Sequence, residues 1–253
     1  MLKSARHTRI RHLVEKQGHV SVTELNDLFD VSDATIRRDL DELAKEGWVR
    51  RTHGGAMKVE RAGKEPPILQ RQGEQAVHKE RLGKAAAALV KRGNTIFLGS
   101  GSTVHQIARN LHHVPELTVI TNSLNIANEL ADRENIELII IGGMFRRSER
   151  SLVGHIAEQA IREFRADHVF MGMRGIDPQH GFTSDYMPEA ATDRAIMTIA
   201  PHVVIVADHT KLGVVSTVFL APVNAAHLII TDQEAPPEIV TELQELGVEV
   251  LVV

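Results

Sequence analysis

The chain has 253 residues, of which 43% are hydrophobic and 25% charged, a composition typical of a globular protein with enough apolar material for a substantial core. It contains no cysteine, which excludes disulfides and thiolate metal sites. It also shows neither a membrane-length apolar run nor a signal peptide, so we expect a cytoplasmic protein without a membrane partner. The net charge is −4, but the segment before residue 59 carries a small excess of Lys and Arg, so overall charge does not exclude nucleic-acid binding.

Capping residues predict two short helices near the start of the chain. Ser21 followed by Glu24 is a capping box and predicts a helix from about residue 22 that ends near Asp30. Ser32 is well placed to cap a further helix, which we expect to end at Gly47. Two short helices around a tight turn predict a helix-turn-helix.

The second of these helices has the composition of a DNA-recognition helix. Ile36, Leu40 and Leu43 cluster on one face, and small or basic side chains lie opposite them near its N-terminal end. The run WVRRTHGGA that follows predicts a β-wing that grips the DNA backbone. Arginines in these places can read guanine edges or hold phosphates, and the alternative interpretation is a solvated charged surface. The residues predicted to contact DNA are Ser32, Ala34, Thr35, Arg37, Arg38, Arg50, Arg51 and His53.

The pattern changes after residue 58. Residues 59–73 are charged, include Pro66-Pro67 and have no clear apolar period, so we predict a linker. Over residues 74–253, short β-branched runs alternate with helical stretches, which predicts an α/β domain whose mainly parallel sheet is covered on both faces. The predicted strands are TIFL, LTVIT, IELIIIG, HVFMGM, HVVIVAD, HLIITD and VEVLVV. The fold class is therefore an α+β winged helix-turn-helix domain (residues 1–58) followed by this larger α/β domain.

Several predicted strands end in glycines, hydroxyls or charged residues. Ligands of parallel sheets bind at the carboxyl ends of the strands, where loops meet helix N-termini. The segment GSGST after the first strand offers backbone N–H groups, hydroxyls and a helix dipole to an anion. Such strand ends are often only tight turns, but five of them at one sheet edge predict a polar pocket. Its predicted lining is Gly99, Ser100, Gly101, Ser102, Thr103, Thr121, Asn122, Ser123, Gly142, Gly143, Arg146, Gly172, Gly175, Asp208 and Lys211.

Nearly the whole chain resembles the DeoR family of bacterial transcriptional regulators. The run from RHTRIRHL to HGGA is similar to the family's winged-helix signature, most clearly in VSDATIRRDLDEL and HGGA. The later segments resemble the family's effector domain, which shares its fold with ribose-5-phosphate isomerase and glucosamine-6-phosphate deaminase. The resemblance implies binding of double-stranded operator DNA, repression of carbohydrate-utilisation genes, and release by a phosphorylated sugar or related metabolite.

The resemblance also implies roles for particular segments. GSGST corresponds to the phosphate loop, TNS and GGMFR to further pocket walls, Glu189 to an acidic position of the family, and DHTKLG to its Asp-x-Ser-Lys element with threonine in place of serine. The chain departs from the family pattern at Gly99, where an aspartate is common, and at Asp193, where a lysine often occurs. These departures imply a change in which sugar hydroxyls or charges are read.

Two other functions fit parts of the sequence. A sugar-phosphate isomerase or deaminase with an accessory DNA-binding domain would need a general base beside the phosphate loop, and Asp208, Glu189 and Lys211 are candidates. No one segment crowds several carboxylates there, so we predict no catalytic residue and no enzyme activity. An architectural DNA binder would leave GSGST without a role. A ligand-responsive regulator accounts for both halves.

Cofactors and assembly complete the expectations. The 14 histidines show no metal-binding spacing along a helix, so we expect neither a metal nor a cofactor. Helix-turn-helix proteins usually read paired half-sites, so we expect a homo-oligomer, a dimer or tetramer, assembled mainly by the C-terminal domain.

Overall fold

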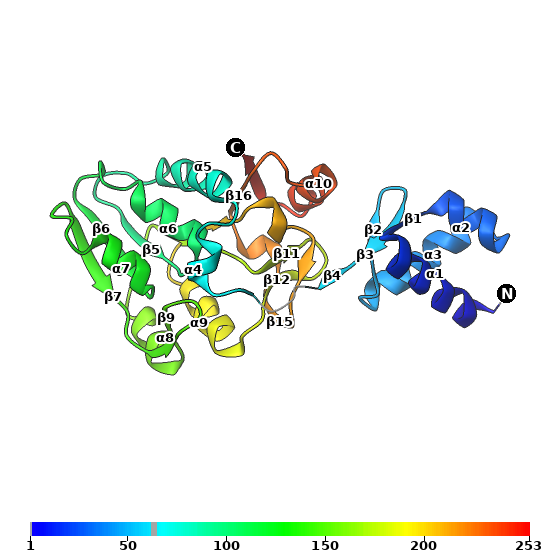
Figure 1. Cartoon of the computed structure of the whole chain (residues 1–253), viewed down its shortest axis with the longest axis horizontal. Coiled ribbons are helices and arrows are strands. Elements are labelled where there is room, and N and C mark those ends of the chain that lie inside the picture. The colour runs from blue at the N-terminus through cyan, green and yellow to red at the C-terminus, as the bar shows by residue number, and fades with distance from the viewer. Residues whose placement is uncertain (1, 62–64) are drawn as a thin grey trace. The chain divides into compact units, whose positions relative to one another are not determined.

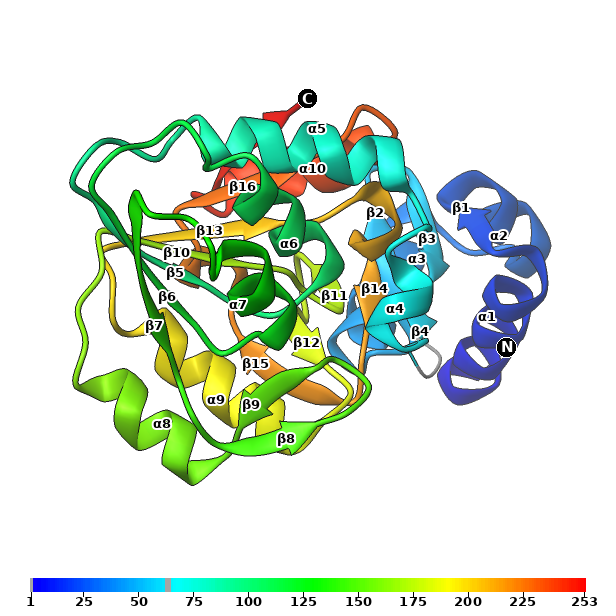
Figure 2. The same ribbon diagram turned by 60° about the vertical axis from the view of Figure 1, so that its left-hand side comes forward.

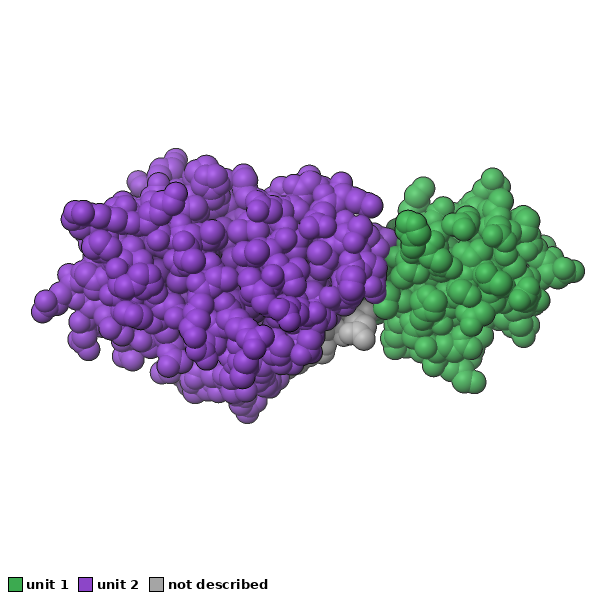
Figure 3. Space-filling view, turned by 90° about the horizontal axis from the view of Figure 1, so that it is seen from above, with its two compact units in different colours: residues 1–61 green, residues 62–253 purple. Residues whose placement is uncertain are grey.

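The computed structural model describes residues 2–61 and 65–253, and the chain divides into two compact units, residues 1–61 and 62–253 (Figure 3). In the N-terminal unit, three antiparallel strands lie in the order β1-β3-β2. The elements of this unit are α1 (Lys3–Gln17), β1 (His19–Ser21), α2 (Val22–Phe29), α3 (Asp33–Lys45), β2 (Val49–Thr52), β3 (Gly55–Lys58) and β4 (Glu60–Arg61) (Figure 1). The predicted winged helix-turn-helix is confirmed.

The predicted helix starts of this unit are present, with one difference in the cap at Ser32. The Ser21–Glu24 capping box forms in both directions, and Asp30 ends α2 in the left-handed conformation. Ser32 does occupy the N-cap of α3, but its side chain accepts no capping hydrogen bond. Its hydroxyl lies 3.0 Å from that of Thr35 instead. The side chain of Ser32 is therefore engaged with the first turn of α3 and leaves the backbone uncapped.

The core of the N-terminal unit forms where the three helices meet the sheet. Ile10, Leu25 and Leu40 are among its almost fully buried members, as the helical spacing predicts. Leu28 is the exception, since 47% of it is exposed. Gly55 is needed because β1 passes so close that a Cβ there would overlap the carbonyl of Val20.

A buried ion pair joins α1 to α3. The Nε of Arg6 donates to the Asp39 carboxylate at 2.5 Å, and the Nε2 of His7 lies 3.0 Å from the same carboxylate. Both Arg6 and Asp39 are buried. Removing one partner of such a pair leaves an uncompensated buried charge, which is strongly destabilising.

The C-terminal unit is built on a parallel sheet. Among the described residues this sheet has seven strands in the order β17-β16-β13-β10-β5-β6-β7, and every neighbouring pair is parallel. Its strands are β5 (Thr95–Leu98), β6 (Leu117–Thr121), β7 (Ile136–Ile140), β10 (His168–Met171), β13 (His202–Val206), β16 (Leu228–Thr231) and β17 (Glu249–Val252). All of the predicted strands are thus confirmed.

Helices cover both faces of the sheet (Figures 1 and 2). Side chains alternate along each strand, so Ile96 and Leu98 pack on one face while Phe97 packs on the other. The first face carries α5 (Ala76–Ala87), α6 (Ser102–Arg109) and α7 (Leu124–Leu130). The second carries α8 (His155–Arg162), α9 (Met187–Met197) and α10 (Pro237–Glu245). Among the described residues, no helix is both long and apolar enough to cross a membrane.

Short elements that the sequence did not predict complete this unit. The strands β11, β12 and β15 form a small antiparallel sheet, and β8 pairs with β9. The predicted linker is also partly folded, because Ile68 and Arg71 in α4 are buried. These elements are α4 (Ile68–Arg71), β8 (Met144–Arg146), β9 (Ser151–Val153), β11 (Gly175–Asp177), β12 (Gly181–Ser184), η1 (His209–Lys211), β14 (Val214–Val215), β15 (Val218–Ala221) and η2 (Val223–Ala225).

Replacing Asp39 by asparagine should destabilise the N-terminal unit by about 3 kcal/mol, because the Arg6 guanidinium loses the carboxylate that compensates for its burial. Trp48 is the only tryptophan of the chain and lies in this unit, so its fluorescence during denaturant unfolding reports on this unit. Breaking the exposed Lys3–Glu42 pair with Lys3→Ala is the control and should leave the Trp48 midpoint nearly unchanged. Equal midpoints for wild type and Asp39→Asn would contradict the prediction.

Candidate functional site

The cavity that the GSGST loop lines lies where the strand order of the C-terminal unit reverses. The chain runs outward from β5 to β6 and β7, then crosses to the other side of β5 and continues through β10 and β13. The loops after β5 and β10 therefore diverge at their carboxyl ends, and such a reversal is the usual ligand crevice of an open α/β sheet. Both loops line the cavity, through residues 99–103 and 171–174.

The GSGST loop has the geometry of an anion-binding helix start. Gly99 donates its N–H to the carbonyl of Phe170 at 2.9 Å, which fixes the loop against β10. Gly101 has a φ of 131° and is the N-cap of α6, a conformation that favours glycine. Ser102 and Thr103 occupy the first turn of the helix and are buried. The first N–H groups of a helix have no intrahelical acceptor, so they are available to an anion.

Ionisable side chains of both signs face this loop. Among the described residues, the cations of the lining are Arg71, Lys79, Arg174 and Lys211, and the acids are Glu65, Glu149, Glu189 and Asp193. The rest of the lining comes mainly from the loops and from Thr183 and Ser184 of β12. The cavity volume is about 60 Å³.

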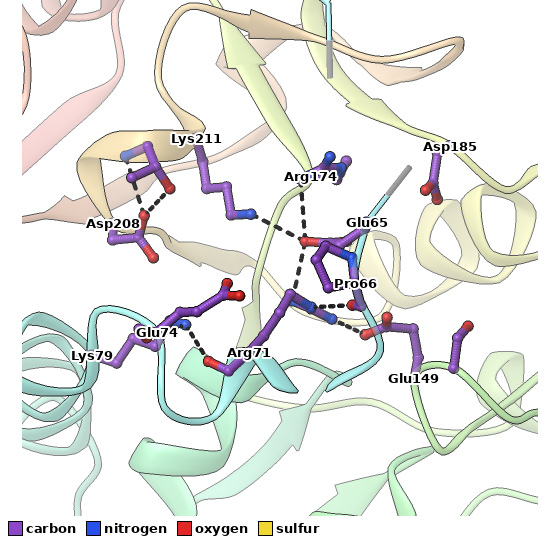
Figure 4. Close-up of polar contacts among 12 residues, drawn as sticks. Glu65, Pro66, Arg71, Glu74, Lys79, Glu149, Arg174, Asp185, Asp208 and Lys211 are labelled. Carbon is purple, nitrogen blue, oxygen red and sulfur yellow. Dashed lines mark hydrogen bonds and ion pairs between the residues drawn. The ribbon is translucent and has the colours of Figure 1, made fainter. Parts of the chain in front are cut away.

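Glu65 contacts three cations of the cavity (Figure 4). Its Oε1 accepts from the Nζ of Lys211 at 3.0 Å and lies 3.1 Å from Nη1 of Arg71. The Nη1 of Arg174 is 3.4 Å from the same oxygen. Arg71 also donates to Glu149 and, through Nε, to the carbonyl of Pro66 at 2.9 Å. Three cationic groups thus converge on one carboxylate oxygen.

Burial raises the pKa values of the other three acids of the cavity. Burial raises the pKa of Glu189 to about 7, against the opposing charge of Arg146. Burial and the neighbouring Glu189 together raise the pKa of Asp193 well above its usual value. Burial also raises the pKa of Glu149, and Arg71 opposes this shift. Near neutral pH the cavity therefore carries less negative charge than its count of carboxyl groups indicates.

Lys79 is held by backbone carbonyls. Its Nζ donates to the carbonyls of Arg71 at 2.8 Å and Glu74 at 2.7 Å. Burial lowers the pKa of this amine, and the charge of Asp208 acts in the opposite direction. Lys79 thus ties the start of α5 to the end of α4.

The structure places half of the predicted pocket residues in this cavity. Those that line it are Gly99, Ser100, Gly101, Ser102, Thr103, Gly172, Glu189 and Lys211. Those that do not are Thr121, Asn122, Ser123, Gly142, Gly143, Arg146, Gly175 and Asp208.

Most of the residues outside the cavity have local structural roles. Thr121 is fully buried and its hydroxyl donates to the carbonyl of Leu98 at 2.7 Å, while Asn122 donates to that of Leu152 at 3.1 Å. The side chain of Ser123 caps α7. These hydrogen bonds satisfy neighbouring backbone groups, and the Oδ1 of Asn122 has no hydrogen-bond partner among the described residues.

The remaining members of this group differ in position. A Cβ at Gly175 would overlap the carbonyl of Val214, which explains the glycine by packing. Asp208 caps η1 by accepting from the N–H of Thr210 at 3.1 Å. Arg146 lies behind the cavity wall, paired with Glu189 and, at 3.2 Å, with Asp185. It therefore acts on the cavity through Glu189.

One histidine–carboxylate group escaped sequence reasoning because its members come from separate elements. His78, His209 and Asp232 each offer one ligand atom, and these atoms lie within 4.8 Å of one another. They could hold a metal ion. The Nδ1 of His209 lies 2.9 Å from the Asp232 carboxylate, so a hydrogen bond also accounts for their proximity.

The predicted DNA surface divides into exposed and engaged residues. On α3, Ser32, Ala34, Arg37 and Arg38 are exposed and Thr35 is half-buried. His53 is exposed in the turn between β2 and β3. These residues remain candidates for DNA contact.

The two wing arginines are engaged within the protein. Arg50 is 2% exposed and its guanidinium contacts the sulfur of Met57, which argues against the predicted phosphate contact. Arg51 is half-buried and donates to the Asp41 carboxylate at 2.8 Å, so it ties the wing to α3. Val49 and Arg50 are neighbours on β2 and both are buried, so alternation along the strand did not indicate the burial of Arg50.

Sequence reasoning missed five charged residues of the cavity. Glu65 and Arg71 fall in the predicted linker, and Lys79 and Glu149 lie in segments without a recognised motif. Arg174 lies two residues after the predicted pocket residue Gly172 and could have been found by extending that segment.

A winged helix-turn-helix joined to an α/β domain with an ionic cavity is the architecture of a ligand-responsive DNA-binding regulator. Two family models match the chain, the DeoR-like helix-turn-helix domain over residues 6–62 and the DeoR C terminal sensor domain over residues 74–233. The chain belongs to the DeoR family.

Curated relatives resemble the chain over nearly its full length. The glycerol-3-phosphate regulon repressor of Escherichia coli K12 is 35% identical over 239 residues, which cover 94% of each chain. The putative aga operon transcriptional repressor of Escherichia coli O157:H7 is 32% identical over 252 residues, 99% of this chain and 94% of that protein.

Solved structures show partial likeness at low identity. Ribose 5-phosphate isomerase A of Methanocaldococcus jannaschii is 20% identical, with a TM-score of 0.39 over 53% of each chain. The translation initiation factor eIF-2B of Pyrococcus horikoshii is 19% identical, with a TM-score of 0.39 over 84% of this chain and 67% of that chain.

The raised pKa of Glu189 predicts a pH-dependent stability. The folded chain binds this proton more tightly than the unfolded chain, whose Glu pKa is near 4.5, so the contribution is full below about pH 4.5 and is lost as pH rises through about 7. Between these values wild type should lose about 3 kcal/mol more stability than Glu189→Gln. Denaturant unfolding followed by circular dichroism measures both. Glu163→Gln, at an exposed acid, should behave as wild type, and parallel profiles for wild type and Glu189→Gln would contradict the prediction.

Proposed function

We propose that this protein is a transcriptional repressor of carbohydrate-utilisation genes that binds double-stranded operator DNA and is released by a phosphorylated sugar or related metabolite. The observation that carries the proposal is the combination, in one DeoR-family chain, of exposed arginines on α3 with a cavity built on the GSGST helix start. Relatives named as repressors of a glycerol-3-phosphate regulon and an aga operon support it.

The cavity supports a small anionic effector. Backbone N–H groups at the start of α6 and the hydroxyls of Ser102 and Thr103 suit a phosphate, because helix N-termini favour anions. Arg71, Arg174 and Lys211 add cationic groups on the same cavity. A polar lining of this kind also suits the hydroxyls of a sugar.

Enzymatic turnover is the second candidate, and one observation favours it. Glu189 lines the cavity with a pKa of about 7, a value that suits a general base. In the sequence, no single segment places several carboxylates beside the GSGST loop. The fold, however, brings Glu65, Glu149 and Asp193 to the cavity as well. However, Glu189 is already paired with Arg146, and the chain carries a DNA-binding domain. We therefore place regulation first, and incubation of the protein with phosphorylated sugars, followed by product analysis, tests turnover.

Assembly and location are part of the same proposal. Helix-turn-helix proteins usually bind two half-sites related by two-fold symmetry, so the repressor acts as a homo-oligomer in the cytoplasm, where its operator lies. Light scattering of the full chain with and without DNA measures the number of subunits.

Arg37→Ala and Arg38→Ala should each weaken operator binding by about 1–3 kcal/mol if the side chain contacts a base edge, since both are exposed on the leading turns of α3. The probe is a duplex that wild type selects from a random-sequence pool, and fluorescence anisotropy gives the affinity. Lys91→Ala removes an exposed cation from the other unit and is the matched control. Both arginine variants binding as tightly as wild type would reject the assignment of α3 to the major groove.

The double variant Ser102→Ala/Thr103→Val should lower effector affinity at least tenfold, because it removes two hydroxyl donors near a charged group at about 1.5–3 kcal/mol each. DNA binding without effector should survive, so the variant should repress even in the presence of inducer. Calorimetric titration with the phosphorylated sugar that most raises the melting temperature of wild type gives the affinity.

Thr241→Val, which removes an exposed hydroxyl on α10, is the matched control and should retain wild-type affinity. Normal release of the double variant from DNA by that sugar would contradict the assignment of the GSGST loop. Multiple turnovers of the sugar by wild type would favour the enzyme instead.

A further inference from the structure

A carboxylate from the segment that enters the C-terminal unit occupies part of the cavity. Glu65 lies a few residues beyond Arg61, where the N-terminal unit ends, and its side chain is only 11% exposed. One of its oxygens is within 3.4 Å of nitrogen atoms of Arg71, Arg174 and Lys211 (Figure 4). These cations come from α4, from the loop after β10 and from η1. The fold thus brings together three distant segments of the C-terminal unit to hold one anion.

The volume of the cavity indicates that something must leave before a ligand enters. About 60 Å³ is free with Glu65 in place. This is room for about two water molecules, whereas pockets for small molecules measure about 300–1,000 Å³. Glu65 is the lining residue nearest the N-terminal unit in the chain, and Ile68 is the first well-buried side chain after it. Withdrawal of this segment enlarges the cavity without breaking the sheet.

The charges of the residues that line the cavity also indicate that Glu65 is the group that leaves. Among the described lining residues, four cations face four acids, one of which is Glu65. Glu149 neutralises Arg71 independently, and the raised pKa values of Glu189 and Asp193 reduce the charge of those two groups. Withdrawal of Glu65 therefore leaves an excess of positive charge beside the GSGST loop, and this excess favours an anion from outside.

We infer that Arg71, Arg174 and Lys211 form an anion subsite of the cavity, that Glu65 occupies this subsite in the ligand-free protein, and that a phosphate or carboxylate group of the effector displaces Glu65 when it binds. This inference rests on the proposed function and adds the chemistry of the ligand: it carries an anionic group for this subsite as well as a group for the GSGST loop. A guanidinium pair with an ammonium group suits a phosphate especially well.

Displacement of Glu65 loosens residues 65–68, at the start of the described part of the C-terminal unit. The carbonyl of the next residue, Pro66, accepts from Arg71, and the N–H of Ile68 donates to the carbonyl of Ser148 at 2.8 Å. These contacts fix the path of residues 65–68 on the C-terminal unit. A ligand that binds at the subsite removes one of the contacts that hold residues 65–68, so its binding free energy is coupled to the freedom of these residues.

Glu65→Gln tests the inference because it removes the competing charge and keeps the size of the side chain. Calorimetric titration of the full-length protein with inorganic phosphate, at ionic strength held constant with chloride, should show affinity at least about tenfold higher for Glu65→Gln than for wild type. Glu65→Asp keeps the charge on a shorter stem and should fall between the two. Glu134→Gln, at an exposed acid of the same unit, is the matched control and should bind phosphate as wild type does.

Two further measurements distinguish competition between Glu65 and phosphate from a general effect of removing one negative charge. Adding Lys211→Met to Glu65→Gln should abolish the gain in affinity, because it removes one of the three cations. Hydrogen exchange of the peptide that spans residues 65–75 should rise when phosphate is added to wild type. In Glu65→Gln this exchange should be high already and should not respond.

Equal phosphate affinity of wild type and Glu65→Gln, or weaker binding by Glu65→Gln, overturns the inference. A gain that survives Lys211→Met overturns it as well, since the anion then binds elsewhere. These outcomes are independent of the proposed function, which is judged by DNA binding of the Arg37 and Arg38 variants. Failure of DNA binding with a phosphate gain at Glu65→Gln would reject the regulator and keep the subsite.

Discussion

The divergence of the loops after β5 and β10 is the constraint on which the site depends. Parallel strands on either side of this point send their connections to opposite sides of the sheet, so the carboxyl ends of β5 and β10 open a crevice that neither strand fills. The GSGST helix start lies on one side of it, and the loop that carries Arg174 lies on the other. The other charged residues of the cavity come from α4, α5, η1 and α9 and from the segments that hold Glu65 and Glu149.

Ionic contacts, rather than apolar packing, determine which charged groups of the cavity pair with one another and which charge they carry. Four acids and four cations line it among the described residues, and the GSGST loop adds the positive end of a helix dipole. In such surroundings, removing or adding one charge changes the preference of every neighbour. The shifted pKa values of Glu189 and Asp193 are one expression of this coupling, and the convergence of three cations on Glu65 is another.

The sequence predicted those features that depend on local pattern. The seven strands were visible because β-branched runs such as TIFL and HVVIVAD are continuous, and the capping box at Ser21 and Glu24 is a short-range signal. Thr121 and Ser123 were placed in the pocket because polar residues at a strand end suit ligands, but backbone groups already engage their hydroxyls. Glu65 and Arg71 were not predicted, because no local pattern marks them as site residues. They are isolated charges in a stretch without an apolar period, and only the tertiary fold shows where they meet.

The pairing of acids on α3 with cations explains how a chain of negative net charge can present a positive surface to DNA. Asp39, Asp41 and Glu42 on this helix are paired with Arg6, Arg51 and Lys3 respectively. The cations that pair with these acids lie on α1 and on the wing, whereas Arg37 and Arg38 are exposed, with the exposed acid Asp33 one turn before Arg37. Electrostatic potentials in physiological salt decay over about 8 Å, so the charges nearest to Arg37 and Arg38 contribute most at that face. The local field at the start of α3, and not the isoelectric point of the chain, therefore governs the long-range attraction of this protein to a duplex.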